Sequence, residues 1–387
     1  MSKARVYISV YGSGMGHAAR MVALAEKLNH MLVFSSWGEG EEYIRREGLK
    51  VLNSPSVDIE WSEQGRMAIK KSVSKLPRNL SSFVLQILHE RAMIKKTSSS
   101  LVISDSRLSS IIASKTLGLP SILITNQLRI ALPLESSYIQ RLLERSVSET
   151  LSLFWDLANE ILAPDLPPPY TISEYTLLNL LSPKRKTKFI GFMVDRPKAE
   201  AMAIERALNL LGLKGKKLVY AQISGPVPTR RWLFDMVLAA SKYLIKDIGM
   251  IVSMGDPEGP KEIIKAGNIR ILPWNELLDP IILVSDLIIS RGGHSTIGKC
   301  ILAGKPMILI PIAYHGEQIN NSKKMEKLGL GRFIDPVKTS PRYLAEKILM
   351  ALDDEGQRRR ASFFSKLATR YDAFRTVKET INYYLAS

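Results

Sequence analysis

The stretch that best predicts the fold is Asp286-Leu-Ile-Ile-Ser-Arg-Gly-Gly-His-Ser-Thr-Ile297. It begins as a buried strand, turns at Gly292-Gly293 and enters a helix at Ser295-Thr296. A helix start presents free backbone N–H groups and the positive end of the helix dipole, and two glycines let a ligand approach the backbone closely. The stretch therefore predicts a turn that binds a diphosphate, formed by Arg291, Gly292, Gly293, His294, Ser295 and Thr296.

A second apolar strand, 306–310, follows this helix and leads to the polar residues Glu317, Gln318 and Asn321. Carboxylate and amide side chains hold sugar hydroxyl groups through hydrogen bonds. One strand end thus offers phosphate binding and the next offers sugar binding. The alternative is that the two strands and the helix only complete an α/β sheet, with Glu317 as a helix cap.

Strands and helices alternate along both halves of the chain, which predicts βαβ units and parallel sheets in two tandem α/β domains. The expected strands are 4–11, 31–36, 50–53, 101–104, 121–125 and 160–163 in the first half, and 217–223, 250–254, 269–272, 286–289 and 307–310 in the second. The linker is expected near 191–198. The tail from Ser340 to Ala386 reads as two helices.

A glycine turn, Gly12-Ser-Gly-Met-Gly-His-Ala-Ala-Arg20, joins the first strand to the first helix. His17 stands where a dinucleotide-binding turn places its third glycine, and the next strand ends without an acidic residue, so dinucleotide binding is not expected. Imidazole is suited to taking a proton from a hydroxyl near neutral pH. We therefore predict that His17 is a general base, and the alternative is a histidine that only caps the helix.

Asp105 follows the strand 101–104 and would face the same cleft. A carboxylate there would orient His17 or act as the base itself, and capping of the next helix is the alternative. No Asp-x-Asp element stands at an obvious strand end, so a catalytic metal is not expected. A helix dipole and backbone donors would stabilise a leaving diphosphate in its place.

The composition describes a globular protein with anionic partners. Lys and Arg number 54 against 37 Asp and Glu, and the formal net charge of +17 favours nucleic acid, an anionic membrane surface or phosphorylated substrates. No zinc-finger, RNP-type or basic-zipper pattern accompanies the charge, so a nucleic-acid partner is not expected. The single cysteine, Cys300, excludes an intramolecular disulfide. With no visible signal peptide or bilayer-length apolar run, we expect a cytoplasmic protein.

The two motifs resemble those of GT-B glycosyltransferases, in particular the MurG-like family 28 enzymes and the archaeal transferases similar to them. The turn with Gly14, Gly16, His17 and Arg20 is similar to the acceptor-side loop of that family, and 290–321 is similar to its donor-binding half. The resemblance implies two Rossmann-like domains facing a cleft, at 1–194 and 195–360. It also implies a terminal helix at 361–387 that packs back on the first domain.

The resemblance assigns further residues and shows two departures. Ser224 and Gly225 would lie beside the diphosphate, and Trp274 against the nucleotide base. The family's His-Glu-Gln-Asn element appears here as Thr125-Asn126-Gln127-Leu128, which assigns Asn126 and Gln127 to the acceptor side and argues against the peptidoglycan lipid as acceptor. The family's ribose-binding glutamate is replaced by Lys299. A lysine does not accept hydrogen bonds, so it would contact a phosphate, or the ribose would be held by backbone.

The resemblance implies an inverting, metal-independent glycosyltransferase without a cofactor. Its donor would be a nucleotide-diphosphate sugar, UDP-linked N-acetylglucosamine or another hexose, and its acceptor a hydroxyl group, for example on a polyprenyl-linked glycan. A nucleotide-sugar hydrolase or epimerase of the same fold is the alternative, because related hydrolases have a similar turn. A non-catalytic subunit of a membrane glycan pathway is a second alternative, which Lys299 favours.

Residues 61–97 form a long insertion with basic and apolar side chains interspersed. Its eight basic residues are Arg66, Lys70, Lys71, Lys75, Arg78, Arg91, Lys95 and Lys96. Basic residues attract anionic lipids, and apolar ones insert at the membrane interface. We therefore predict a peripheral location on the inner face of the membrane, with an ordinary solvated helix pair as the alternative.

Overall fold

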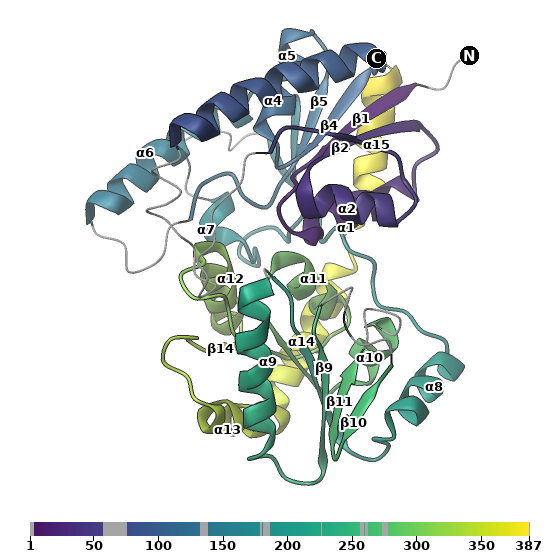
Figure 1. The fold of residues 1–387 in the computed structure, drawn as a ribbon, viewed down its shortest axis with the longest axis vertical. Helices are drawn as coiled ribbons and strands as arrows, with labels where there is room; N and C mark the ends of the chain where they lie inside the picture. The colour runs from purple at the N-terminus through teal and green to yellow at the C-terminus, as the bar shows by residue number, and fades with distance from the viewer. Residues whose placement is uncertain are drawn as a thin grey trace. The chain divides into compact units, whose positions relative to one another are not determined.

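The computed structural model describes residues 4–56, 76–131, 138–178, 180, 186–225, 227–255, 259, 262–272 and 278–386. They form two compact units (Figure 1). Of the described residues, unit 1 holds those up to Val194 together with 371–386, and unit 2 holds those from Asp195 to Arg370. Each unit has its own sheet and its own hydrophobic core.

Unit 1 is built on a seven-stranded sheet in which all neighbouring strands are parallel. In spatial order the strands are β3 (Val51–Asn53), β2 (Met31–Ser36), β1 (Arg5–Val10), β4 (Leu101–Asp105), β5 (Ser121–Ile124), β6 (Glu160–Ala163) and β7 (Thr187–Phe189). The strand order reverses direction between β1 and β4. In sheets of this kind, ligands bind in the crevice at the carboxyl ends of such a pair.

Helices cover both faces of this sheet. One face packs against α1 (Met15–Ala25), α2 (Gly38–Arg46) and α15 (Ala373–Ala386), and Figure 1 shows α15 beside β1. The other face packs against α4 (Leu76–Lys96), α5 (Leu108–Thr116) and α6 (Tyr138–Trp155). A short helix, α7 (Glu174–Leu177), follows β6. Successive side chains of β1 point to opposite faces, so Val6, Ile8 and Val10 line the first core while Tyr7 lies in the second.

Unit 2 has the same architecture with one antiparallel edge. Its strands, in spatial order, are β10 (Ile264–Ala266), β11 (Ile269–Leu272), β9 (Ile248–Ser253), β8 (Lys217–Gln222), β12 (Leu287–Ser290), β13 (Met307–Leu309) and β14 (Gly331–Phe333). All pairs are parallel except β10 with β11. The order reverses between β8 and β12, and the carboxyl ends of those two strands are where a ligand is expected in such a sheet.

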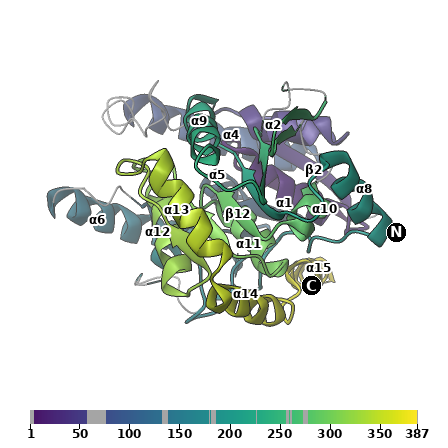
Figure 2. The ribbon, with the colours of Figure 1, turned by 90° about the horizontal axis from the view of Figure 1, so that it is seen from below.

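Two helices, α9 (Val227–Ser241) and α13 (Pro341–Leu352), build the main core of unit 2 with one face of the sheet. The other helices are α8 (Ala201–Leu211), α10 (Leu278–Val284), α11 (His294–Leu302), α12 (Gly316–Lys327) and α14 (Glu355–Ala368). Helices α11 and α14 lie side by side (Figure 2), and Ser365 Oγ donates to the Leu302 carbonyl over 2.9 Å.

The tail forms three helices, α13, α14 and α15, where two were expected. Each begins at a side-chain cap: Ser340 Oγ accepts from the N–H of Tyr343, Asp354 Oδ1 from that of Gln357, and Asp372 Oδ1 from that of Arg375. Each cap accepts a hydrogen bond from a free N–H group in the first turn of a new helix, and so marks where one helix ends and the next begins. Helix α14 belongs to unit 2, and α15 lies in the core of unit 1.

The two parallel sheets confirm the expected α/β class. Every expected strand is present, with its ends moved by a few residues. The short strands β7, β10 and β14 were not expected, because a basic residue at the centre of each interrupts the apolar run that would indicate a strand.

Candidate functional site

The glycines of the turn after β1 have separate local causes. A Cβ on Gly12 would collide with the carbonyl oxygen of Trp37, and the Gly12 carbonyl accepts a hydrogen bond from the N–H of Gly40 over 2.9 Å. Gly14 caps α1 with a φ of +81°, which favours glycine. Gly16 lies in the first turn of that helix. The turn therefore starts α1 close to the end of β1.

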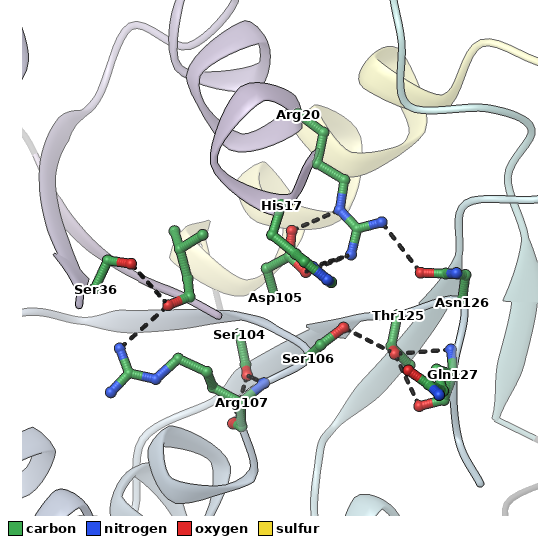
Figure 3. A network of polar contacts seen from close by, with 11 residues as sticks. His17, Arg20, Ser36, Ser104, Asp105, Ser106, Arg107, Thr125, Asn126 and Gln127 are labelled. Atoms are coloured by element: carbon green, nitrogen blue, oxygen red, sulfur yellow. Dashed lines mark hydrogen bonds and ion pairs between the residues drawn. The ribbon is translucent and has the colours of Figure 1, made fainter. Parts of the chain in front are cut away.

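His17 and Asp105 form the centre of the site in unit 1 (Figure 3). His17 Nδ1 lies 2.7 Å from Asp105 Oδ1. Asp105 ends β4 and is fully buried, whereas 26% of the His17 side chain is exposed. The carboxylate accepts a hydrogen bond from Nδ1–H, so the proton of the neutral ring lies on Nδ1. Nε2 is then the basic nitrogen. The pair therefore forms an imidazole that is oriented to accept a proton at Nε2.

Arg20 supplies a cationic partner for the same carboxylate. Its Nε donates to Asp105 Oδ2 over 2.6 Å, and its Nη2 donates to Oδ1. Burial by itself raises the pKa of Asp105, but Arg20 and His17 outweigh burial and hold the pKa of this carboxyl below its usual range. Asp105 is therefore an anion beside the His17 ring.

The loop after β5 completes this cluster. Asn126 Oδ1 accepts from Arg20 Nη1 over 3.3 Å, and the Asn126 side chain is buried. Gln127 contributes its backbone, because its N–H donates to Thr125 Oγ1 over 3.0 Å and its carbonyl accepts from the same hydroxyl over 3.1 Å. The structure thus brings His17, Arg20, Asp105 and Asn126 together at the carboxyl ends of β4 and β5 (Figure 3).

Sequence reasoning missed a second polar cluster behind this one. Arg107, two residues after Asp105, forms an ion pair with Glu90 of α4, and the two side chains are 1% and 0% exposed. A charged residue two positions after a strand end was the only local signal for Arg107. No pattern points to Glu90, because it lies on another element and its partner follows only after β4.

In unit 2, the turn after β8 lies against the segment that follows β13. Gly225 has a φ of +104°, and a Cβ there would lie 3.1 Å from Ile312 Cδ1. The Gly225 carbonyl accepts from Arg230 Nε over 2.6 Å. Ser224 precedes this glycine, and α9 begins at Val227. The Ser224-Gly225 turn therefore leads into a helix at the carboxyl end of β8.

The turn after β12 is held against α12. Gly292 has a φ of +83°, and a Cβ there would lie 2.9 Å from the Gln318 carbonyl oxygen. The Gly292 carbonyl accepts from Asn321 Nδ2 over 3.3 Å, and Asn321 is 1% exposed. Gln318 Oε1 accepts from the N–H of Ile312 over 2.9 Å. Asn321 and Gln318 thus link the segments that follow β12 and β13. Their contacts bring the predicted diphosphate turn and the predicted sugar-binding residues together.

His315 caps the helix that carries Glu317. Its Nδ1 accepts from the N–H of Gln318 over 3.4 Å, so the cap is His315 and not Glu317. Burial lowers the pKa of His315, and the neighbouring charge of Glu317 opposes that shift. Glu317 is half-buried in the first turn of α12.

Arg291 is a buried cation next to the Gly292 turn. It is 2% exposed, its Nη2 donates to the Thr229 carbonyl, and its Cζ lies 5.8 Å from the Trp232 ring centroid. Burial lowers the pKa of Arg291 to about 9. Within the described part of the chain it has no carboxylate partner, and its Nε has no hydrogen-bond acceptor.

Helix α11 starts directly after this turn. Gly293 precedes it, His294 is its buried first residue, and Ser295 and Thr296 are half-buried in its first turn. Backbone N–H groups in the first turn of a helix have no acceptor within that helix. A buried guanidinium and a helix start therefore lie together at the carboxyl end of β12.

Lys299 is paired with a carboxylate. Its Nζ lies 2.6 Å from Asp279 Oδ1 on α10, and Asp279 Oδ2 also accepts from the N–H of Lys198 over 3.3 Å. Both side chains of the ion pair are partly exposed. Trp274, assigned to the nucleotide base, lies outside the described residues.

Comparisons with known proteins agree on one class of enzyme. The glycosyltransferase family 28 C-terminal domain matches residues 247–375. An uncharacterized glycosyltransferase of Methanopyrus kandleri is 26% identical, and the match covers 88% of this chain and 92% of that protein. The UDP-N-acetylglucosamine–N-acetylmuramyl-(pentapeptide) pyrophosphoryl-undecaprenol N-acetylglucosamine transferase of Staphylococcus epidermidis is 28% identical over 46% of this chain and 50% of its own length.

The likeness in fold extends over the whole chain. The crystal structure of the glycotransferase of kitacinnamycin matches with a TM-score of 0.67 over 99% of both chains, at 15% identity. Two parallel-sheet units and this likeness confirm the expected GT-B fold. Together with the family 28 domain and the Methanopyrus relative, they support a GT-B glycosyltransferase of the family 28 type.

Proposed function

We propose that this glycosyltransferase moves a sugar from a nucleotide-diphosphate donor to a hydroxyl acceptor by direct displacement, with inversion at the sugar carbon. The observation that carries the proposal is the contact of His17 Nδ1 with the buried Asp105. His17 Nε2 takes the hydroxyl proton while the acceptor oxygen forms a bond to the sugar carbon. The bond from that carbon to the diphosphate oxygen breaks, and its electron pair leaves with the diphosphate.

Asp105 and Arg20 have different roles beside this base. The Asp105 anion stabilises the imidazolium that forms and keeps the proton of the neutral ring on Nδ1. Arg20 contacts both Asp105 oxygens, and this contact disfavours protonation of Asp105 itself. His17, and not Asp105, is therefore the proposed base.

We assign the donor to the strand ends of unit 2. The diphosphate would bind at Gly292 to Thr296, where its charge would compensate the buried Arg291. Backbone N–H groups and Arg291 would stabilise the leaving diphosphate, so the proposed reaction needs no divalent metal. Glu317 and Gln318 would hold the sugar. The name of the staphylococcal relative supports UDP-N-acetylglucosamine as the first donor to test.

We further propose a lipid-linked acceptor and a peripheral contact with an anionic membrane. Helices α4 and α6 both contact α5 and expose large apolar side chains: Leu80, Val84, Leu85 and Leu88 on α4, and Tyr138, Leu142, Leu143, Val147, Leu153 and Phe154 on α6. Exposed basic residues lie on the same helices, namely Arg91, Lys95, Lys96, Arg141 and Arg145. In the described ranges, no helix is long and apolar enough to span a bilayer. Residues 61–75 of the basic insertion lie outside the described residues.

The test of the proposed base is His17→Ala. Turnover of UDP-N-acetylglucosamine with a polyprenyl-linked acceptor should fall by roughly 10²- to 10⁴-fold, the usual effect of losing a general base. The melting temperature and the thermal shift with UDP should stay near those of the wild type. His30→Ala, which removes a histidine whose Nε2 contacts Asn382, is the matched control and should leave turnover unchanged.

Two results would contradict the proposal. A near-native rate for His17→Ala would place the base elsewhere, with Asp105 as the next candidate. Equal release of UDP with and without any acceptor would instead support a nucleotide-sugar hydrolase.

A further inference from the structure

We infer that Arg107 and Glu90 are positioning residues for the His17–Asp105 pair, an inference that rests on the proposed role of His17 as the base. Both side chains are enclosed, and Arg107 Nη2 donates to Glu90 Oε1. Burying two charges is unfavourable, and apolar side chains of similar volume often hold a core equally well. We therefore infer that the Arg107–Glu90 pair has a role other than stability, and the contacts of the pair indicate which role.

Arg107 and Glu90 join several elements near the carboxyl ends of β2, β3 and β4. Arg107 Nη1 donates to the Ser35 carbonyl in β2 over 3.0 Å, and Nη2 donates to Ser54 Oγ, just past β3, over 2.7 Å. Glu90 Oε1 accepts from the hydroxyls of the same two serines, over 2.9 and 3.2 Å. The end of β4, where Asp105 lies, is thereby fixed to β2, to the exit of β3 and to α4.

Ser106, between Asp105 and Arg107, has a left-handed backbone with a φ of +55°. Its N–H donates to the Ile124 carbonyl over 3.1 Å, and its Oγ donates to Thr125 Oγ1 over 3.0 Å. A non-glycine residue keeps this conformation only where its surroundings enforce it. Arg107 is the anchor on one side of the turn, and Figure 3 shows Asp105 facing α1 while Arg107 extends away from it.

A chain of ring contacts joins Arg107 to His17 by a second route. The Arg107 Cζ lies 4.8 Å from the Trp37 ring centroid. The ring of Tyr11 lies edge-on to Trp37 at 5.2 Å and to His17 at 5.4 Å. Arg107 thus supports both partners of the pair: Asp105 through the backbone, and His17 through two aromatic rings.

Glu90→Gln tests this role, because it removes the charge of Glu90 and keeps its shape. We expect kcat to fall by about 10²-fold, as for a reacting group displaced by about 1 Å. The KM for the donor and the thermal shift with UDP should not change, because the assigned donor residues lie in unit 2. Adding Ser106→Gly should restore about tenfold of the lost kcat, since glycine adopts a positive φ without strain.

Two further variants complete the test. Ser54→Ala removes a hydroxyl that bonds to both Arg107 and Glu90, and it leaves their charges paired. It should therefore lower kcat less than Glu90→Gln does, and it tests the positioning role even if Glu90→Gln does not fold. Ser114→Ala is the matched control in α5: its buried hydroxyl bonds to the Ile111 carbonyl, and its loss should leave kcat unchanged.

The inference is overturned if Ser54→Ala and folded Glu90→Gln both keep the wild-type kcat, or if Ser106→Gly restores none of the loss. His17→Ala distinguishes this failure from that of the proposed function. If His17→Ala is inactive and Glu90→Gln is fully active, only the positioning role fails. If His17→Ala is active, the assignment of the base fails.

Discussion

Asn321, Gln318 and Glu317 are polar residues of α12 with different surroundings. These surroundings indicate which side chains hold the fold together and which would contact a ligand. Asn321 is buried, and its amide bonds to the Gly292 carbonyl. Gln318 accepts from the N–H of Ile312 through its side-chain oxygen, so its side-chain amide nitrogen is the atom that would contact a sugar. Glu317 is only half-buried in the first turn of α12, and His315 is the N-cap of that helix. Because Glu317 is a carboxylate that is partly exposed, we expect it to accept a hydrogen bond from a sugar hydroxyl.

Glu317→Ala should weaken binding of UDP-N-acetylglucosamine by about 10- to 150-fold, because a hydrogen bond to a charged group contributes about 1.5–3 kcal/mol. Binding of UDP alone should be nearly unchanged. Calorimetric titration with both ligands measures the difference. Glu326→Ala, near the other end of α12, is the control and should alter neither affinity. An equal loss for UDP and for UDP-N-acetylglucosamine would remove the sugar assignment.

Among the elements, α6 is unusual because its buried stripe is largely polar. Glu144, Ser148 and Ser152 are buried, with Glu144 bound to Arg129 and Ser148 Oγ bound to the N–H of Ile130. The outward face carries the large apolar residues, up to 81% exposed at Tyr138. A face of this kind is unfavourable in water and favourable at the boundary of a lipid layer.

Charge reversal on α6 tests contact with lipid. Arg141→Glu with Arg145→Glu should weaken binding to anionic vesicles by at least about 2 kcal/mol, or ~30-fold, since each basic residue near the surface contributes about 1 kcal/mol. Binding should also fall as salt rises, because ions screen the attraction. A sedimentation assay measures both effects. The control is Arg342→Glu with Arg359→Glu, which makes the same change of charge at exposed positions of unit 2. No difference between the two double variants, or equal binding to neutral vesicles, would contradict the proposed membrane contact.

At the scale of the whole molecule, each unit has a core of its own, and the chain returns to unit 1 only at its end. Phe374, Val377 and Ile381 of α15 are buried with Val6 and Ile8 of β1. The stability of each unit therefore depends on its own buried groups, including the titratable ones near its site. Their pKa shifts predict how stability depends on pH.

The melting temperature should fall as the pH drops below about 6.5, the usual pKa of an unfolded histidine. Burial lowers the pKa of folded His315, so the unfolded chain takes up this proton first, and the stability that neutral His315 contributes is lost on the acid side. His315→Asn keeps a capping side chain and removes the titration. Its melting temperature should change less between pH 7 and 5.5, as measured by calorimetry. An unchanged pH slope would rule out His315 as the cause. The pKa of Asp105 is lowered in the folded protein, so the stability that its charged form contributes is lost only below about pH 4.

Local patterns in the sequence determined the two parallel sheets, the two glycine turns and the candidate residues at strand ends. Apolar runs, glycines and helix starts are properties of neighbouring residues, so they are visible without a structure. The tertiary structure decided which candidates meet. His17 contacts Asp105, 88 residues away, because β4 inserts beside β1, and no periodic pattern states the strand order.

The same reason accounts for what the sequence did not show. Glu90 meets Arg107 only because α4 covers the sheet behind β4, and Lys299 meets Asp279 only because α10 packs near α11. Side-chain caps, and not periodicity, divided the tail into three helices. Residue types and spacing determined the kind of chemistry that each strand end offers. The order of the strands and the cover of the helices decided which side chains act together, because contacts between distant segments depend on the packed fold and not on local propensity.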